Sequence, residues 1–132
     1  CVACDTCGES GRCIFDDDTN DVVAAVEEAD IVVFATPVYW WGISAQLKLI
    51  IDKFYSRASK LEECTKKVGV IAIGEAEQDD AQYSLISMQF HCICRYLGWD
   101  VAFCNTYTAG EAGELAKNAE AMAELEELWK TL

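Results

Sequence analysis

The sequence has little positive charge, a single histidine and no long apolar run. Ten Lys and Arg residues stand against 23 Asp and Glu residues, so the net charge is −13. A field of that sign repels phosphate backbones and anionic lipid, which argues against nucleic acid or a membrane surface as a partner. No apolar run approaches the ~18 residues of a membrane span, and no signal-peptide pattern is present. We therefore expect a cytoplasmic protein.

The lone histidine does not indicate a catalytic site. His91 falls in the middle of a predicted helix between Phe90 and Cys92, where a packed or partly exposed histidine is more common than a general base. No pair of acid and base residues stands out elsewhere. We name no catalytic side chain.

Cysteine, in contrast, is abundant, and four of the eight cysteines occupy the first thirteen residues. Their spacing is Cys1-x2-Cys4-x2-Cys7-x5-Cys13, short enough for one loop to turn all four sulfurs toward one centre. Repeated Cys-x2-Cys steps are typical of iron–sulfur ligands, whereas structural zinc sites pair two cysteine knuckles across a longer gap. The spacing favours a 4Fe–4S cluster over zinc, and four reduced thiols without a metal are the alternative.

The other four cysteines do not resemble a disulfide framework. They fall inside apolar helical or strand patterns, as buried free thiols do, which favours a reducing compartment: Cys64, Cys92, Cys94 and Cys104. On a helix, Cys92 and Cys94 would diverge by about 200° and form no dithiol site.

The chain length and apolar content fit one domain over residues 1–132. The sequence has 132 residues and is 52% hydrophobic, enough for one core. We divide it into a cysteine loop, residues 1–18, and a body, residues 30–132. Between them, Asp16, Asp17 and Asp18 are interpreted as caps of a short helix that ends near Ala29, rather than as metal ligands.

Strand and helix patterns alternate through the body. The run from Asp30 to Thr36 is β-branched, apolar and stops at Pro37, which is typical of a strand covered on both faces. The remaining predicted elements are a helix from Leu47 to Phe54 capped by Ser44, a strand from Lys67 to Ile73, a helix from Ala81 to Leu97, a strand from Trp99 to Cys104, and a helix from about Glu111 to the end. The order βαβαβα predicts an α/β fold, a parallel sheet with helices on both faces.

In such sheets ligands bind beyond the carboxyl ends of the strands, here residues 36–42, 74–77 and 105–110. Three large rings follow the first strand, Tyr39, Trp40 and Trp41. They cannot all enter the core, so we expect some to line the pocket of a flat ligand or to pack across a dimer interface.

Residues 35–48, ATPVYWWGISAQLK, and residues 51–55, IDKFY, resemble the flavodoxin-like NAD(P)H-dependent FMN reductase family. The cysteine spacing is similar to that of its iron–sulfur flavoprotein branch, and the resemblance covers nearly the whole chain. It implies a flavodoxin-like three-layer sandwich that binds FMN and a 4Fe–4S cluster, and homo-oligomers that pass electrons between the two cofactors. By this resemblance the metal ligands are Cys1, Cys4, Cys7 and Cys13, and the flavin is bordered by Thr36, Pro37, Val38, Tyr39, Trp40, Trp41, Gly42, Gly74 and Glu75.

The chain departs from the family in one respect. The family begins with a strand, a Gly-Ser-rich phosphate loop, a helix and a second strand, and nothing in this sequence corresponds to that unit. Its absence would leave residues 31–36 as an unpaired sheet edge and uncover the apolar stripe from Leu115 to Leu132. We expect either that upstream sequence supplies the unit or that the chain self-associates and binds FMN weakly.

Three functions are consistent with these patterns. The first is electron transfer between FMN and a 4Fe–4S cluster, with donor and acceptor unknown. The second is an NAD(P)H-dependent FMN or quinone reductase without a cluster. The third is a cofactor-free oligomerisation module.

Overall fold

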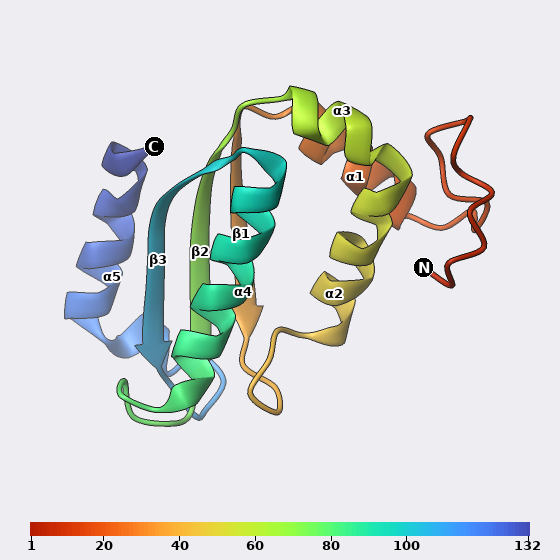
Figure 1. Ribbon diagram of the computed structural model, residues 1–132. Coiled ribbons are helices and arrows are strands. Elements are labelled where there is room, and N and C mark those ends of the chain that lie inside the picture. The colour runs from red at the N-terminus through yellow and green to blue at the C-terminus, as the bar shows by residue number, and fades with distance from the viewer.

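A computed structural model describes all 132 residues, and its centre is a parallel sheet of three strands (Figure 1). The strands are β1 (Ile31–Pro37), β2 (Lys67–Gly74) and β3 (Asp100–Thr108), and β2 lies in the middle. Phe34 pairs with Val70, which in turn pairs with Cys104. All carboxyl ends of the strands therefore meet at one edge, and the predicted parallel α/β fold is confirmed.

Helices connect the strands. They are α1 (Thr19–Glu28), α2 (Ala45–Asp52), the 3-10 turn η1 (Lys53–Arg57), α3 (Ala58–Glu63), α4 (Ala81–Leu97), η2 (Leu115–Lys117), α5 (Ala119–Glu127) and η3 (Leu128–Thr131). The sequence predicted the bounds of α4, which ends at Gly98 with a φ of 72°. The predicted cap of α2 is also present, since the Ser44 hydroxyl accepts from the amide of Leu47 at 3.3 Å. None of these helices combines the length and the apolar character that a membrane span requires.

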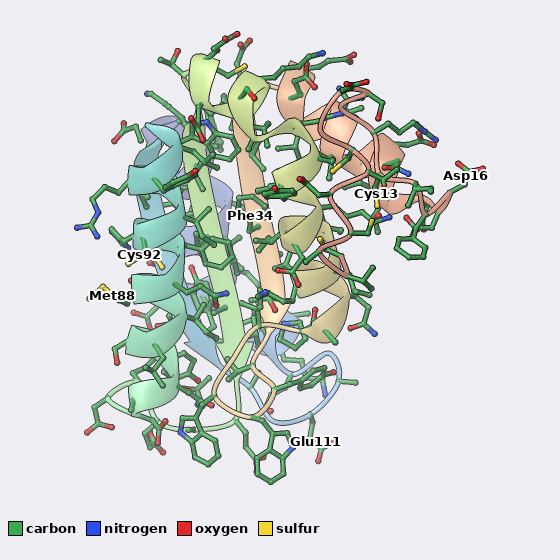
Figure 2. The ribbon with its side chains drawn as sticks, turned by 45° about the vertical axis from the view of Figure 1, so that its right-hand side comes forward. Cys13, Asp16, Phe34, Met88, Cys92 and Glu111 are labelled. Carbon is green, nitrogen blue, oxygen red and sulfur yellow. The ribbon has the colours of Figure 1, made fainter.

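The core lies between the sheet and the helices α1 to α4. Aromatic rings connect the elements: the Phe34 and Phe90 centroids are 5.1 Å apart, and those of Phe54 and Trp99 are 6.0 Å apart. The indole nitrogen of Trp99 also donates to the carbonyl of Leu61 at 3.0 Å, so its polar atom is satisfied inside the core. Figure 2 shows Phe34 between β1 and the helices. This packing fixes α2, α4 and the strand ends relative to one another.

Two expectations about coverage of the sheet were wrong. β1 is not covered on both faces, because Ile31 and Val33 are nearly half exposed on the face opposite Phe34. The helix on that side, α5, lies beside β3 and leaves β1 open (Figure 1). The stripe of the terminal helix is in turn half-buried rather than uncovered, since Leu125 and Leu128 are partly buried.

The last two elements also differ from their predicted bounds. β3 continues to Thr108, four residues beyond Cys104, because its pairing with β2 runs to Gly74. The terminal helix begins at Ala119 instead of near Glu111, since the side chain of Asn118 caps it by accepting from the amide of Ala121 at 3.1 Å. Residues 109–114 therefore form a loop at the carboxyl edge of the sheet.

Candidate functional site

The carboxyl edge of the sheet carries a cavity of about 370 Å³. Two backbone hydrogen bonds extend the sheet beyond the strands and shape this edge: Val38 N to Ile73 O and Ala109 N to Gly74 O, both at 2.7 Å. The cavity is lined by Ala35, Thr36, Pro37, Ile73, Ala109, Glu111, Ala112, Gly113 and Leu115. Its size falls within the ~300–1,000 Å³ of small-molecule sites.

A strained hairpin stands next to this edge. Tyr39 and Gly42 exchange two backbone hydrogen bonds, at 2.9 and 3.1 Å, so Trp40 and Trp41 form a two-residue turn. Their φ angles are 50° and 59°, a left-handed conformation that favours Gly or Asn and is unfavourable for bulky side chains. Strain of this kind concentrates at binding and catalytic sites. The turn holds the Trp40 side chain in water, where it is 92% exposed.

Thr36 connects the cavity to the hairpin. Its buried hydroxyl accepts from the amide of Ser44 at 3.0 Å and donates to the carbonyl of Pro37 at 2.8 Å. These bonds fix the chain on both sides of residues 38–42. Both ends of the hairpin are therefore held in place by hydrogen bonds to Thr36.

Not all predicted flavin residues line the cavity. Thr36 and Pro37 do, whereas Gly42 and the three aromatic residues form the neighbouring hairpin and Val38 joins it to β1. Gly74 is buried beneath the edge, where an added Cβ would lie 3.0 Å from Val38 Cγ2, and Glu75 lies against Gly110. The structure thus brings these residues to one edge of the sheet.

The segment after β3 supplies residues that the sequence reasoning did not assign to the site. They are Glu111, Ala112, Gly113 and Leu115, whereas Ala109 falls within the predicted range 105–110. Figure 2 shows Glu111 at the carboxyl ends of the strands, where the hairpin also lies. The signal available was Gly113, which was included in the helix predicted from about Glu111.

The cavity suits one part of a flavin better than the other. Six of its lining residues are Ala, Pro, Ile or Leu, which match a flat apolar ring. None is Lys or Arg, so the lining offers no cation to a phosphate. The residues present therefore fit an isoalloxazine ring, and the phosphate would lie outside this cavity.

The cysteine loop is a second candidate site. The Thr6 hydroxyl donates to Cys4 Sγ at 3.4 Å, and this bond lowers the pKa of the Cys4 thiol. Ala3 and Asp5, on either side of Cys4, have φ angles of 54° and 57°. Left-handed residues at both positions turn the backbone sharply around Cys4. The loop is wound rather than extended.

Side chains of the body hold this loop in place. The buried Asn20 accepts from the amide of Cys13 at 3.1 Å and donates to the carbonyls of Cys13 and Phe15 at 3.3 and 2.8 Å. The buried Lys53 pairs with Asp17, and the Tyr55 hydroxyl donates to Asp5 at 2.9 Å. Lys53, followed by Thr19, lowers the pKa of Asp17 to about 2. The loop is thus attached to α1 and η1.

The four cysteines of the loop are not gathered around a common centre. Cys1 and Cys4 are exposed, Cys13 is partly buried and Cys7 is buried. No three His, Cys, Asp or Glu side chains lie close enough to hold a metal ion. The loop also lies beside α1 and α2, away from the carboxyl ends of the strands (Figure 1).

The remaining cysteines have separate environments. Cys94 is buried, and burial raises the pKa of its thiol to about 11. Cys92 is exposed on the same helix, so the expected divergence of the two is confirmed but the expected burial of Cys92 is wrong. His91 is exposed and its Nδ1 lies 2.8 Å from the carbonyl of Ser87, one turn back.

The parallel sheet, the flanking helices and a ligand-sized cavity at the carboxyl edge define a flavodoxin-like α/β protein. Several solved structures share this fold, and two are described here. The Trp repressor binding protein of Bacillus subtilis has a TM-score of 0.70 and 24% identity, over 85% of this chain and 70% of that one. General stress protein 14 of Treponema denticola, solved in complex with FMN, has a TM-score of 0.66 and 18% identity, over 89% of this chain and 75% of that one.

The sequence places the chain more narrowly. A family model for NADPH-dependent FMN reductase matches residues 2–125, and the chain belongs to this family. An iron–sulfur flavoprotein of Methanocaldococcus jannaschii is 33% identical over 91 residues, which are 69% of this chain and 46% of that protein. The chain thus spans about half the length of that curated relative. The family membership predicted from residues 1–18 and 35–55 is confirmed.

Proposed function

We propose that this chain is part of a flavin-dependent redox protein that transfers electrons between FMN and a 4Fe–4S cluster. The observation that carries the proposal is the apolar cavity at the carboxyl edge of the sheet, next to a strained hairpin that presents Trp40 to solvent. A flavin ring needs an apolar slot and an aromatic surface, and this edge supplies both.

The flavin half of the proposal assigns the ring to this edge. Pro37 and Ile73 contribute apolar walls, and the hairpin of residues 39–42 offers a ring for stacking. When bound, the flavin supplies the capacity to accept and release electrons. The chain's own residues orient the ring and exclude water from one of its faces. The family and the FMN complex of a protein with the same fold support this assignment.

The cluster half assigns the four cysteines as ligands. Four thiols at this spacing are donors of the right chemistry for a 4Fe–4S cluster, and a similar protein bears the name iron–sulfur flavoprotein. Cys7 and Cys13 are already fixed by burial and by Asn20, while Cys1 and Cys4 are exposed. Ligation would require the loop to close and bring Cys1 and Cys4 to the other two.

Flavin binding is tested by fluorescence titration with FMN and with riboflavin. Because the cavity offers the phosphate no cation, the 132-residue chain should bind the two flavins with similar affinities, within about threefold. Quenching by neither flavin would reject the site. A much tighter complex with FMN alone would show that the chain holds the phosphate through residues outside the cavity.

Cluster binding is tested by anaerobic reconstitution with iron and sulfide. The chain should take up about four irons and four sulfides, and Cys7→Ser should abolish uptake. Cys92→Ser removes an exposed thiol outside the loop and serves as the matched control, which should keep full iron content. Unchanged iron in Cys7→Ser would reject the ligand assignment.

A cluster-free NADPH-dependent flavin or quinone reductase is the second candidate. The separation of the four sulfurs and the name of the family favour it. In that case NADPH would reduce bound FMN equally fast in the wild type and in Cys7→Ser. Iron uptake by the wild type would argue against it.

A further inference from the structure

A second cavity lies between α5 and β3, at the edge of the sheet farthest from β1 (Figure 1). Its volume is about 360 Å³, and its lining residues are Gln78, Thr106, Tyr107, Thr108, Leu115, Asn118, Glu120, Ala121 and Glu124. The cavity proposed for the flavin ring shares only Leu115 with it. This second cavity is therefore not used by the flavin or by the cysteine loop, and we call it the α5 cavity.

The walls of the α5 cavity differ in chemistry. On the side of β3, the side-chain amide of Gln78 is hydrogen-bonded to the hydroxyls of Thr106 and Thr108, at 2.6 and 2.9 Å. The wall formed by α5 carries the carboxylates of Glu120 and Glu124. Residues four apart lie on the same face of a helix, so both carboxylates face the same side of α5. The cavity thus combines neutral hydrogen-bonding groups with two negative charges.

Tyr107 is the residue that indicates a ligand. It lines the α5 cavity, only 5% of it is exposed, and its hydroxyl has no hydrogen-bond partner. Buried hydroxyls nearly always have a partner, because an unpaired one has lost its bonds to water and gained none. Burial and the negative charge of Glu124 raise the pKa of Tyr107, so the hydroxyl lies on the side of the carboxylate wall. A ligand in the cavity would supply the missing partner.

The charge of the α5 cavity selects the class of ligand. No Lys or Arg lines it, so Glu120 and Glu124 have no counter-charge there. Asn105 Nδ2 donates to Glu124 Oε1 at 2.6 Å, which fixes this carboxylate and leaves its second oxygen for a ligand. Both carboxylates and the net charge of −13 repel an anion and attract a cation. A metal ion does not fit, because no three His, Cys, Asp or Glu side chains lie close enough to hold one. The class that remains is an organic cation.

We propose that the α5 cavity binds a small aliphatic amine. The ammonium group of the amine donates to Glu120, to Glu124 and to the hydroxyl oxygen of Tyr107. An ammonium has three N–H donors, and these three side chains offer it three acceptors. The carbon chain of the amine lies against Leu115 and Ala121, the two aliphatic residues of the lining.

Calorimetric titration of the chain with putrescine, an aliphatic diamine, tests the site. Butanediol is the neutral probe of the same length. Glu120→Gln should weaken putrescine binding about tenfold, because a charge-assisted hydrogen bond is lost. Glu126→Gln is the matched control, since it removes the same charge from α5 outside the cavity. It should leave the affinity within about twofold, because a distant exposed charge is screened by salt.

Tyr107→Phe separates contact with a ligand from a purely structural role. The variant removes a hydroxyl that makes no hydrogen bond in the fold, so the melting temperature of the free chain should not fall. The affinity for putrescine should nevertheless fall about fivefold, because the ammonium loses one acceptor. Absence of putrescine binding, unchanged affinity in Tyr107→Phe, equal losses in Glu120→Gln and Glu126→Gln, or equally tight binding of butanediol would each overturn the proposal.

Discussion

Replacing Trp40 by Asn should stabilise the fold and weaken flavin binding at the same time. The φ angle of Trp40 is 50°, and a bulky residue in this left-handed region costs about 1–2 kcal/mol relative to one that tolerates it. Asn tolerates the region and is favoured in two-residue hairpin turns. The hairpin itself should stay closed, since the hydrogen bonds between Tyr39 and Gly42 are backbone bonds.

The loss of the ring offsets part of this gain. Trp40 is 92% exposed, so the side chain buries only about 20 Å² of apolar surface, and its removal costs about 0.5 kcal/mol. Trp40→Asn should therefore raise the free energy of unfolding by about 1 kcal/mol. If the indole stacks on the flavin, the lost stacking of about 1 kcal/mol weakens FMN binding about fivefold.

Urea denaturation and FMN titration measure the two effects on one sample. The midpoint of unfolding should rise at an unchanged m-value, and the dissociation constant of FMN should rise with it. Trp129→Asn is the matched control, because Trp129 is exposed in η3 and its backbone is not left-handed. It should give neither effect. A destabilised Trp40→Asn would refute the strain argument, and an unchanged FMN affinity would refute the stacking argument.

Three further predictions concern the loop and the sheet. Asn20→Leu removes the hydrogen bonds to Cys13 and Phe15, so alkylation of Cys13 should accelerate about tenfold and iron uptake should fall. Asn118→Leu is the control and should change neither quantity. Equal alkylation rates in Asn20→Leu and the wild type would contradict the anchoring role of Asn20. The pKa of Asp17 is lowered to about 2, so the contribution of this carboxylate to stability is complete above its unfolded-state pKa of 3.8 and is lost as the pH falls through about 2. The amide chemical shifts of residues 17–19 should titrate with a midpoint near pH 2 in the wild type and should not do so in Asp17→Asn. A midpoint near pH 4 would exclude the Lys53 contact. Gly69→Ala would place its methyl carbon 2.2 Å from Cζ of Phe103 and should cost about 1–3 kcal/mol, most of it recovered in Gly69→Ala/Phe103→Leu. A neutral single variant would show that the ring can move away.

Local patterns were sufficient where one physical signal dominates. α4 follows from the helical spacing of Ile86, Phe90 and Leu97 and from Gly98, which takes the left-handed conformation that ends the helix. Ser44 and the β-branched run of β2 likewise act through their neighbours in sequence. The edge of the sheet that holds the candidate site follows from strand order alone.

Features that depend on tertiary contacts were not predictable in this way. The open face of β1 results from the position of α5 beside β3, which no residue of β1 encodes. The loop of residues 109–114 exists because the helix begins only after its cap at Asn118, and because the amide of Ala109 bonds to the carbonyl of Gly74. The left-handed turn at Trp40 and Trp41 opposes the preference of both residues, so propensity argues against it.

The most direct test of the central claim is the absorption spectrum of the chain after anaerobic reconstitution with FMN, iron and sulfide and removal of unbound material. The account predicts the two visible bands of a flavin on a broad shoulder from the cluster, with the shoulder absent in Cys7→Ser. A spectrum with flavin bands alone in the wild type would contradict the cluster assignment, and one with neither feature would contradict the proposed function.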